Sequence, residues 1–248
     1  MIHRIKKYVK HLIAPDLRYK IHRIPHPLKK LGTAYGGWTI PTTLLGKDSV
    51  CYLAGAGVDI SFDAALARRI GCPVWIFDPT PRAQQHFDQL IKAAANHKTF
   101  YVYPDTPYDI DPASASLLHF IPIGLWNHAD TVKFFAPKND THVSHSISNL
   151  QDTDHYFEAK VQRLSDIMQT RGHQRLDLLK LDIEGAEFEV LDTILEDGID
   201  ITILCVEFHP EKDGSKARIQ AALDKLVDHG FRIIARDEMD FTFLKTAP

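Results

Sequence analysis

From residue 49 onward, short apolar runs alternate with segments whose apolar residues recur at helical spacing. The runs SVCYLAGAG and PVWIFDPTP predict strands, and the segments that follow them, SFDAALARRIG and RAQQHFDQLIKAAANH, predict helices. Both strand runs are almost continuously apolar, as in a parallel sheet that is covered on both faces. The alternation therefore predicts a doubly wound, Rossmann-like α/β fold with helices on both faces of the sheet.

Five further apolar runs extend this pattern to the end of the chain. LLHFIPIGLW predicts a third strand, LDLLKLD a fourth and ITILCVEF a fifth. FRIIAR and DFTFLK predict a closing antiparallel hairpin, with Asp237 to Asp240 as its tight turn. Residues from about 126 to 175 break the rhythm with short β-like pieces and one helix. Because insertions near strand ends often carry substrate contacts, we expect this region to bind the substrate.

Residues 1–48 differ from the rest and are expected to form an N-terminal extension. The first 30 residues carry nine Lys or Arg against one acid, Asp16. Apolar residues at helical spacing predict a short amphipathic helix that ends near Pro15. This helix either docks on the core with a solvated basic face or meets an anionic acceptor or a membrane surface as a peripheral contact.

Length, charge and cysteine content restrict the classes of function. The chain has 248 residues, 44% of them apolar, which suffices for one full-sized α/β core, expected over residues 49–248. The formal net charge of -3 argues against a nucleic-acid partner. Cys51, Cys72 and Cys205 form no C-x-x-C pair and predict buried thiols in a reducing compartment. Without a signal peptide or a run of about 18 apolar residues, we expect a cytoplasmic protein with no transmembrane segment.

The ends of the first two predicted strands carry residues suited to a nucleoside. At Gly55 and Gly57 the backbone can turn sharply, and a ligand can approach without a Cβ in the way. Asp78 ends the second strand, and its carboxylate can accept hydrogen bonds from both ribose hydroxyls. Ile60 stands where the dinucleotide fingerprint has its third glycine, which argues against an NAD-linked oxidoreductase. Asp59 suits a cationic cofactor such as S-adenosylmethionine, or alternatively caps the following helix.

Ionisable residues follow the fourth and fifth predicted strands. Lys180, Asp182 and Glu184 alternate along the chain and therefore share a face, as do Glu207 and His209. Because a lone buried cation is costly, we expect Lys180 to pair with one of the carboxylates. These five are the candidate catalytic residues, with His209 as the first choice for a general base. The alternatives are a solvated or capping histidine, a structural ion-pair network, and a divalent metal site of oxygen and imidazole ligands.

Several blocks of the sequence resemble the FkbM family of O-methyltransferases. They are AGAGVDISFD, FDPTP, IPIGLW, APKNDTHVSHSISNL, LLKLDIEGAEFEVL and VEFHP, and they run from about residue 50 to the C-terminus. The resemblance implies a seven-stranded methyltransferase sheet with one antiparallel strand and S-adenosylmethionine as the cofactor. It also implies an acceptor hydroxyl on a sugar, a glycan or a secondary metabolite.

The resemblance also assigns residues to the parts of the cofactor. It places the methionine part near Gly55, Gly57 and Ser61, the ribose at Asp78 in a loop shaped by Pro79 and Thr80, and the adenine near Ile123, Gly124 and Leu125. His145 and Ser146, in the inserted region, are candidate contacts to the acceptor. The competing interpretations are an NAD-linked oxidoreductase and a non-catalytic nucleoside-binding module. The ionisable cluster argues against the module, because such groups are expensive without a task.

Overall fold

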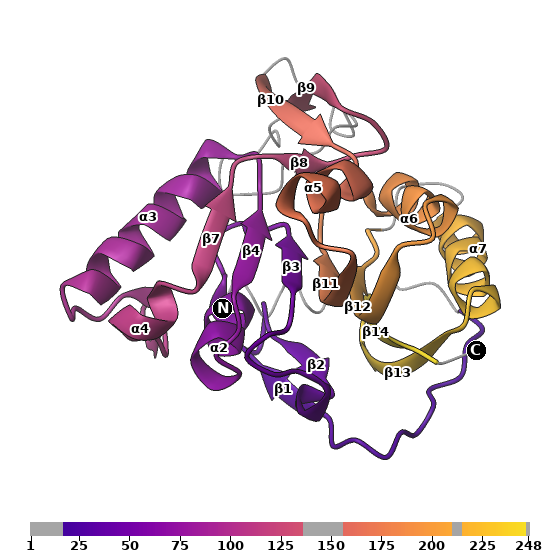
Figure 1. The fold of residues 1–248 in the computed structure, drawn as a ribbon, viewed down its shortest axis with the longest axis horizontal. Coiled ribbons are helices and arrows are strands. Elements are labelled where there is room, and N and C mark those ends of the chain that lie inside the picture. Colours follow the sequence, from indigo (N-terminus) through magenta and orange to yellow (C-terminus); the bar gives the residue numbers. More distant parts are fainter. Residues whose placement is uncertain (1–16, 136–155, 210–214, 247–248) are drawn as a thin grey trace.

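The computed structural model describes residues 17–135, 156–209 and 215–246. Its main sheet is formed by β3 (Cys51–Ala54), β4 (Val74–Phe77), β7 (Leu118–Ile121), β11 (Arg175–Leu181), β12 (Asp200–Glu207), β13 (Phe231–Asp237) and β14 (Asp240–Lys245). These seven strands lie in the order β13-β14-β12-β11-β3-β4-β7 (Figure 1). Strand β14 runs antiparallel to both of its neighbours, and the pairs from β12 to β7 are parallel. The predicted seven-stranded sheet with one antiparallel strand is confirmed.

Helices cover both faces of this sheet, as predicted. They are α2 (Ser61–Arg69), α3 (Pro81–Ala95), α4 (Pro112–Ala115), α5 (Leu164–Arg171), α6 (Glu187–Glu196) and α7 (Ser215–Asp228). Helices α2 and α3 contribute to one buried apolar cluster, and α5, α6 and α7 contribute to the other. Along β3, Cys51 and Leu53 lie in the first cluster, whereas Tyr52 and Ala54 lie in the second. Both faces of the strand are thus buried, which explains why its sequence is continuously apolar.

The predicted hairpin is confirmed, whereas the predicted third strand is divided. Residues 238 and 239 form the two-residue turn between β13 and β14. LLHFIPIGLW does not form one strand, because β7 ends at Ile121 and the chain bends at Pro122, where the amide of Ile123 donates to the carbonyl of Ile121. The amide of Ile123 thus bonds within its own segment and does not continue the pairing of β7 with β4, whose last Cα partners are Phe77 and Ile121. The residues that follow, β8 (Gly124–Leu125), belong to a different sheet.

This second sheet joins β8 to β9 (Asp130–Phe135) and β10 (Tyr156–Gln162) in the order β8-β10-β9. It lies beyond the carboxyl ends of the parallel strands of the main sheet (Figure 1). A Cβ added to Gly124 would lie 3.4 Å from Cγ of Pro79, so β8 packs against the loop that follows β4. The inserted region therefore begins next to the loop that carries Asp78 and Pro79.

Part of the predicted N-terminal extension packs on the core. Residues 29–40 form a small antiparallel pair, β1 (Lys29–Leu31) and β2 (Trp38–Ile40), whose apolar side chains join the cluster around α2. The remaining short elements are η1 (Thr42–Leu44), β5 (Tyr101–Tyr103) and β6 (Thr106–Pro107). The predicted amphipathic helix before Pro15 lies outside the described residues. Within the described ranges, no helix has the length and apolar character needed to cross a membrane.

Candidate functional site

The order of the sheet reverses between β3 and β11. The chain passes from β3 outward to β4 and β7 and then returns to β11 on the other side of β3. Ligands of open α/β sheets bind at such a switch point, outside the carboxyl ends of the strands. Gly55 follows β3 here with a φ of 86°, and a Cβ added to it would lie only 1.6 Å from the carbonyl oxygen of Asp182. The candidate cofactor turn and the first candidate catalytic residues therefore lie in direct contact.

Asp78 holds the glycine turn in place. Its Oδ2 atom accepts hydrogen bonds from the backbone amides of Ala56 and Gly57 at 2.9 and 3.0 Å. Its Oδ1 atom accepts from the backbone amide and the hydroxyl of Thr80 at 2.8 and 2.6 Å. A carboxylate offers about four lone-pair sites, so all of them have a protein donor here. A ribose hydroxyl would have to share or displace one of these donors.

Asp59 and Ser61 also have protein partners in this structure. Asp59 accepts hydrogen bonds from the hydroxyls of Thr33 and Tyr103 at 2.7 and 3.0 Å and from the amide of Ser61 at 3.0 Å. The hydroxyl of Ser61 accepts from the amide of Thr33 at 2.8 Å. Burial, together with the negative charge of Asp59, raises the pKa of Tyr103 and keeps its phenol protonated as a donor. Asp59 and Ser61 thus connect the turn to distant segments by hydrogen bonds. Their contact with a cofactor stays a prediction.

The three residues predicted near the adenine lie at the start of the second sheet. Gly124 and Leu125 are buried, and Ile123 is half-buried. Through Pro79 this segment packs against the loop of Asp78. The structure therefore gathers these predicted cofactor residues around one end of the main sheet. The candidate acceptor contacts His145 and Ser146 lie outside the described residues.

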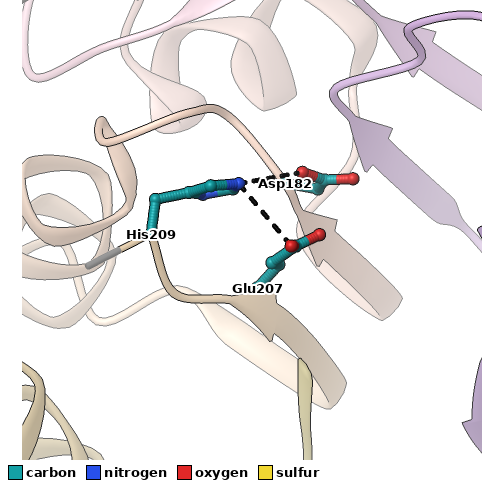
Figure 2. Close-up of side chains that lie close together, drawn as sticks. All are labelled: Asp182, Glu207 and His209. Carbon is teal, nitrogen blue, oxygen red and sulfur yellow. Dashed lines mark ion pairs between the residues drawn. The ribbon is translucent and has the colours of Figure 1, made fainter. Parts of the chain in front are cut away.

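Figure 2 shows Asp182, Glu207 and His209 pointing toward one another from the ends of β11 and β12. One side-chain atom of each lies within 4.8 Å of the corresponding atoms of the other two. The Nε2 atom of His209 lies 3.8 Å from Oδ1 of Asp182, 3.7 Å from Oε1 of Glu207 and 3.5 Å from Oε2 of Glu184. The parallel pairing of β11 with β12 brings these four predicted residues together.

Lys180 joins this cluster to the glycine turn. Its side chain is 6% exposed, and its Nζ atom donates to the carbonyl of Gly55 at 2.6 Å and lies 3.2 Å from Oδ2 of Asp182. The predicted pairing of Lys180 with a carboxylate is thereby confirmed. Burial by itself lowers the pKa of Lys180, but the carboxylates of Asp182 and Asp63 more than offset this and raise it. The ammonium group therefore stays charged.

Glu187 is a site residue that the sequence analysis missed. Its side chain is fully buried, and its Oε1 atom lies 2.8 Å from Nδ1 of His209. Its carboxylate also accepts from the backbone amides of Ile183 and Gly185 at 3.0 to 3.1 Å. Burial lowers the pKa of His209, but Glu184, Glu187 and Glu207 outweigh it and raise this pKa well above its usual value. Glu187 thus fixes the direction of the imidazole.

The sequence near Glu187 contains a pattern that could have predicted its buried position, whereas no sequence pattern indicates the partners of Asp59. Glu187 lies three and seven residues before Val190 and Ile194, on the apolar stripe that α6 turns toward the sheet. A charged residue on such a stripe must find buried partners. Thr33 and Tyr103, in contrast, lie 26 and 44 residues from Asp59 along the chain, and only the tertiary fold brings them close.

Comparison with known proteins places this arrangement in a family. The family described as "Methyltransferase FkbM domain" matches residues 54–233. Over 93 residues the chain is 33% identical to the 31-O-demethyl-FK506 methyltransferase FkbM of Streptomyces tacrolimicus, covering 37% of this chain and 34% of that protein. Over 92 residues it is 34% identical to the methyltransferase sdnD of Sordaria araneosa, covering 34% of each. The matched segment thus spans about a third of the length of these two relatives.

Two solved structures are similar at low sequence identity. The magnesium protoporphyrin IX methyltransferase ChlM from Synechocystis, with bound S-adenosylmethionine, gives a TM-score of 0.39 at 14% identity, covering 82% of this chain and 72% of that one. An rRNA methylase from Streptococcus thermophilus gives a TM-score of 0.42 at 12% identity, covering 83% of this chain and 92% of that one.

Proposed function

The chain belongs to the FkbM family of S-adenosylmethionine-dependent methyltransferases, and we propose that it methylates a hydroxyl of a sugar, a glycan or a secondary metabolite. One observation carries this proposal: Lys180 bonds both the carbonyl of Gly55 and the carboxylate of Asp182. The candidate cofactor turn and the ionisable cluster are therefore adjacent, and Lys180 contacts both. Methyl transfer to a hydroxyl needs this proximity, because the nucleophile must lose its proton beside the sulfonium.

The residues at the switch point fit S-adenosylmethionine. A Cβ added to Gly57 would meet no atom within 4 Å, which leaves open space against the backbone of the turn. The cofactor carries a sulfonium and an ammonium group but no phosphate, and carboxylates surround this end of the sheet. Gly55, Gly57 and Asp78 would hold it, with Ile123 to Leu125 beside its base. When bound, the cofactor supplies a methyl carbon that the sulfonium activates.

The chain's own groups would align the acceptor and remove its proton. An alcohol has a pKa far above neutrality, so its oxygen becomes a good nucleophile only as the proton leaves. The carboxylates of Asp182, Glu184 and Glu207 and the imidazole of His209 surround one position beside the cofactor turn. We assign to the carboxylates the acceptance of the hydroxyl proton. The imidazole, whose pKa the neighbouring carboxylates raise, helps to orient the hydroxyl.

Two observations favour a neutral hydroxylated acceptor. The relative from Streptomyces tacrolimicus is named as a methyltransferase of 31-O-demethyl-FK506. The mouth of the site is rich in carboxylates and the chain has a net charge of -3, which would repel the phosphates of a nucleic acid. The family match also supports methyl transfer over an NAD-linked oxidation or a non-catalytic module.

Transfer of a labelled methyl group tests this proposal. S-adenosylmethionine with a radioactive methyl group is incubated with pools of neutral sugars, glycans, alcohol-bearing metabolites, DNA and RNA. We expect label in a hydroxylated pool together with release of S-adenosylhomocysteine, and a loss of about a hundredfold or more in rate for Asp182→Asn.

The matched control is Asp192→Asn on α6, where the exposed carboxylate pairs with Lys225. It removes the same charge at a distance from the cluster and should keep the wild-type rate. Label in the nucleic acids alone, or an Asp182→Asn variant with the full rate, would contradict the proposed function.

A further inference from the structure

We propose that Asp182, Glu207 and His209 (Figure 2) bind a divalent cation of the Mn²⁺ class at the carboxyl ends of β11 and β12. Glu184 would be a further oxygen ligand. Binding of the cation follows from the geometry of the cluster. Only its effect on the acceptor rests on the function proposed above.

The distances in the cluster suit a shared cation. The Nε2 atom of His209 lies 3.5 to 3.8 Å from carboxylate oxygens of Glu184, Glu207 and Asp182. These separations exceed the usual 2.7–3.2 Å of an N–H···O hydrogen bond. Atoms that share a cation at about 2.1 Å from each lie roughly 3.0–3.5 Å apart, so small side-chain rotations would complete the coordination.

The orientation of His209 is a second feature, independent of the carboxylates that face its Nε2 atom. Nδ1 lies 2.8 Å from the fully buried carboxylate of Glu187. Metal-binding imidazoles usually donate their other ring N–H to a carboxylate or a carbonyl, which fixes the tautomer and the ring direction. Glu187 is itself held by the amides of Ile183 and Gly185, so the direction of Nε2 toward the three oxygens is built into the start of α6.

Several carboxylates of the described cluster lie close together around one histidine. Four carboxylates, those of Asp182, Glu184, Glu187 and Glu207, surround His209 within 4 Å. The ammonium of Lys180 is already directed to Asp182 and to the carbonyl of Gly55. Grouped carboxylates that are partly removed from water repel one another, and a divalent cation among them offsets this repulsion.

The ligand set indicates the class of cation. Carboxylate oxygens prefer Mg²⁺, Ca²⁺ and Mn²⁺, whereas an imidazole nitrogen suits transition metals, so one nitrogen among several oxygens points to Mn²⁺. A cation here would coordinate the acceptor oxygen and lower the pKa of its hydroxyl beside the sulfonium. The proton would pass to water or a carboxylate, the O–C bond would form as the S–C bond breaks, and S-adenosylhomocysteine and the methyl ether would result. His209 is then a ligand and not the proton acceptor.

Electron paramagnetic resonance of added Mn²⁺ tests the proposal on the full chain, without cofactor or acceptor. We expect one Mn²⁺ per chain and an electron spin echo signal with nitrogen coupling from an imidazole. Glu207→Gln and His209→Gln should each weaken binding by about tenfold or more, and His209→Gln should also remove the nitrogen coupling. Glu187→Gln leaves the ligands in place but loosens the imidazole, and should weaken binding by about tenfold to a hundredfold.

The matched control is Glu196→Gln at the far end of α6, an exposed carboxylate paired with Arg163. It should bind Mn²⁺ as the wild type does, and circular dichroism shows whether each variant is folded. Absence of saturable binding at millimolar Mn²⁺, absence of nitrogen coupling in the wild type, or equal affinity in a folded Glu207→Gln variant would overturn the proposal.

Calorimetry of S-adenosylhomocysteine with excess chelator, on the same samples, separates the two proposals. Binding of this product without any binding of Mn²⁺ removes the cation site and leaves the methyltransferase intact. Saturable Mn²⁺ binding without methyl transfer to any hydroxylated pool supports the cation site and contradicts the proposed function.

Discussion

Asp63 shows at the scale of one residue how burial sets a charge beside this site. It is 2% exposed in the first turn of α2, and burial raises its pKa to about 6, against a partial offset from Lys180. The ordinary pKa of the group is 3.8, so between about pH 4 and pH 6 the folded state binds more protons than the unfolded state. Stability therefore falls as pH rises through this window, and the loss of about 3 kcal/mol persists above it.

Asp63→Asn should remove this pH-dependent loss. Relative to the wild type, the variant should gain about 2 kcal/mol in free energy of unfolding between about pH 4.5 and pH 7.5. Urea unfolding of both proteins at the two pH values measures the difference. Asp88→Asn, on an exposed position of α3, controls for the loss of a charge alone. A stability difference between Asp63→Asn and the wild type that is the same at both pH values would contradict the account of Asp63.

Single residues of the site were predictable where spacing along one strand decides their direction. The alternation of Lys180 with Asp182, and of Glu207 with His209, predicted shared faces, and parallel pairing of the two strands brought these faces together. Contacts from distant segments had no such pattern. The hydrogen bonds of Asp59 to Thr33 and Tyr103 depend on the positions of two small hairpins that the sequence analysis did not predict.

The turn after β3 is the element on which the site depends most. Gly55 and Gly57 both have positive φ values, of 86° and 53°, but their surroundings differ. An added Cβ meets the Asp182 carbonyl at 1.6 Å in the first case and open space in the second. Gly55→Ala should therefore cost more than about 3 kcal/mol or prevent folding, whereas Gly57→Ala should cost only about 1–2 kcal/mol, for the left-handed conformation alone.

Thermal and urea unfolding of the two variants measure this contrast. Each variant is the control for the other, because both add one methyl group to a glycine of positive φ in the same turn. Equal losses of stability would show that the carbonyl of Asp182, directly after β11, does not lie against Gly55 as in the structure.

Elements were predictable where their own sequence pattern is strong. The long runs predicted β3, β4, β11 and β12, and the pattern around Asp237 to Asp240 predicted the hairpin of β13 and β14. The break at Pro122 was missed, because the apolar run continues past it. Helix α7 was also not predicted. Strands β5 and β6 were not predicted either, because they have only three and two residues, too few to show a periodic pattern.

At the scale of the whole molecule, the order of the strands turns these local features into a site. Reversal of the winding between β3 and β11 places the glycine turn, the loop of Asp78 and the ionisable cluster at one end of the sheet. The alternating pattern of strands and helices predicted a doubly wound fold, in which the winding reverses, but not the order of the strands. Region 126–175 was predicted as an insertion with short β-like pieces and one helix. The sheet that its strands β9 and β10 form with β8 was not predicted, because it depends on long-range pairing.

Calorimetric binding of S-adenosylmethionine, S-adenosylhomocysteine and NADH is the measurement that tests the central claim most directly. It uses the wild type, Asp78→Ala, and Asp88→Ala as an exposed control. We predict that both adenosyl compounds bind the wild type and the control, and that NADH binds neither. Asp78→Ala should lose about tenfold or more in affinity for the adenosyl compounds, because it removes the hydrogen bonds that hold the glycine turn and an acceptor for the ribose. Binding of NADH without binding of either adenosyl compound would contradict the assignment of this switch point to S-adenosylmethionine.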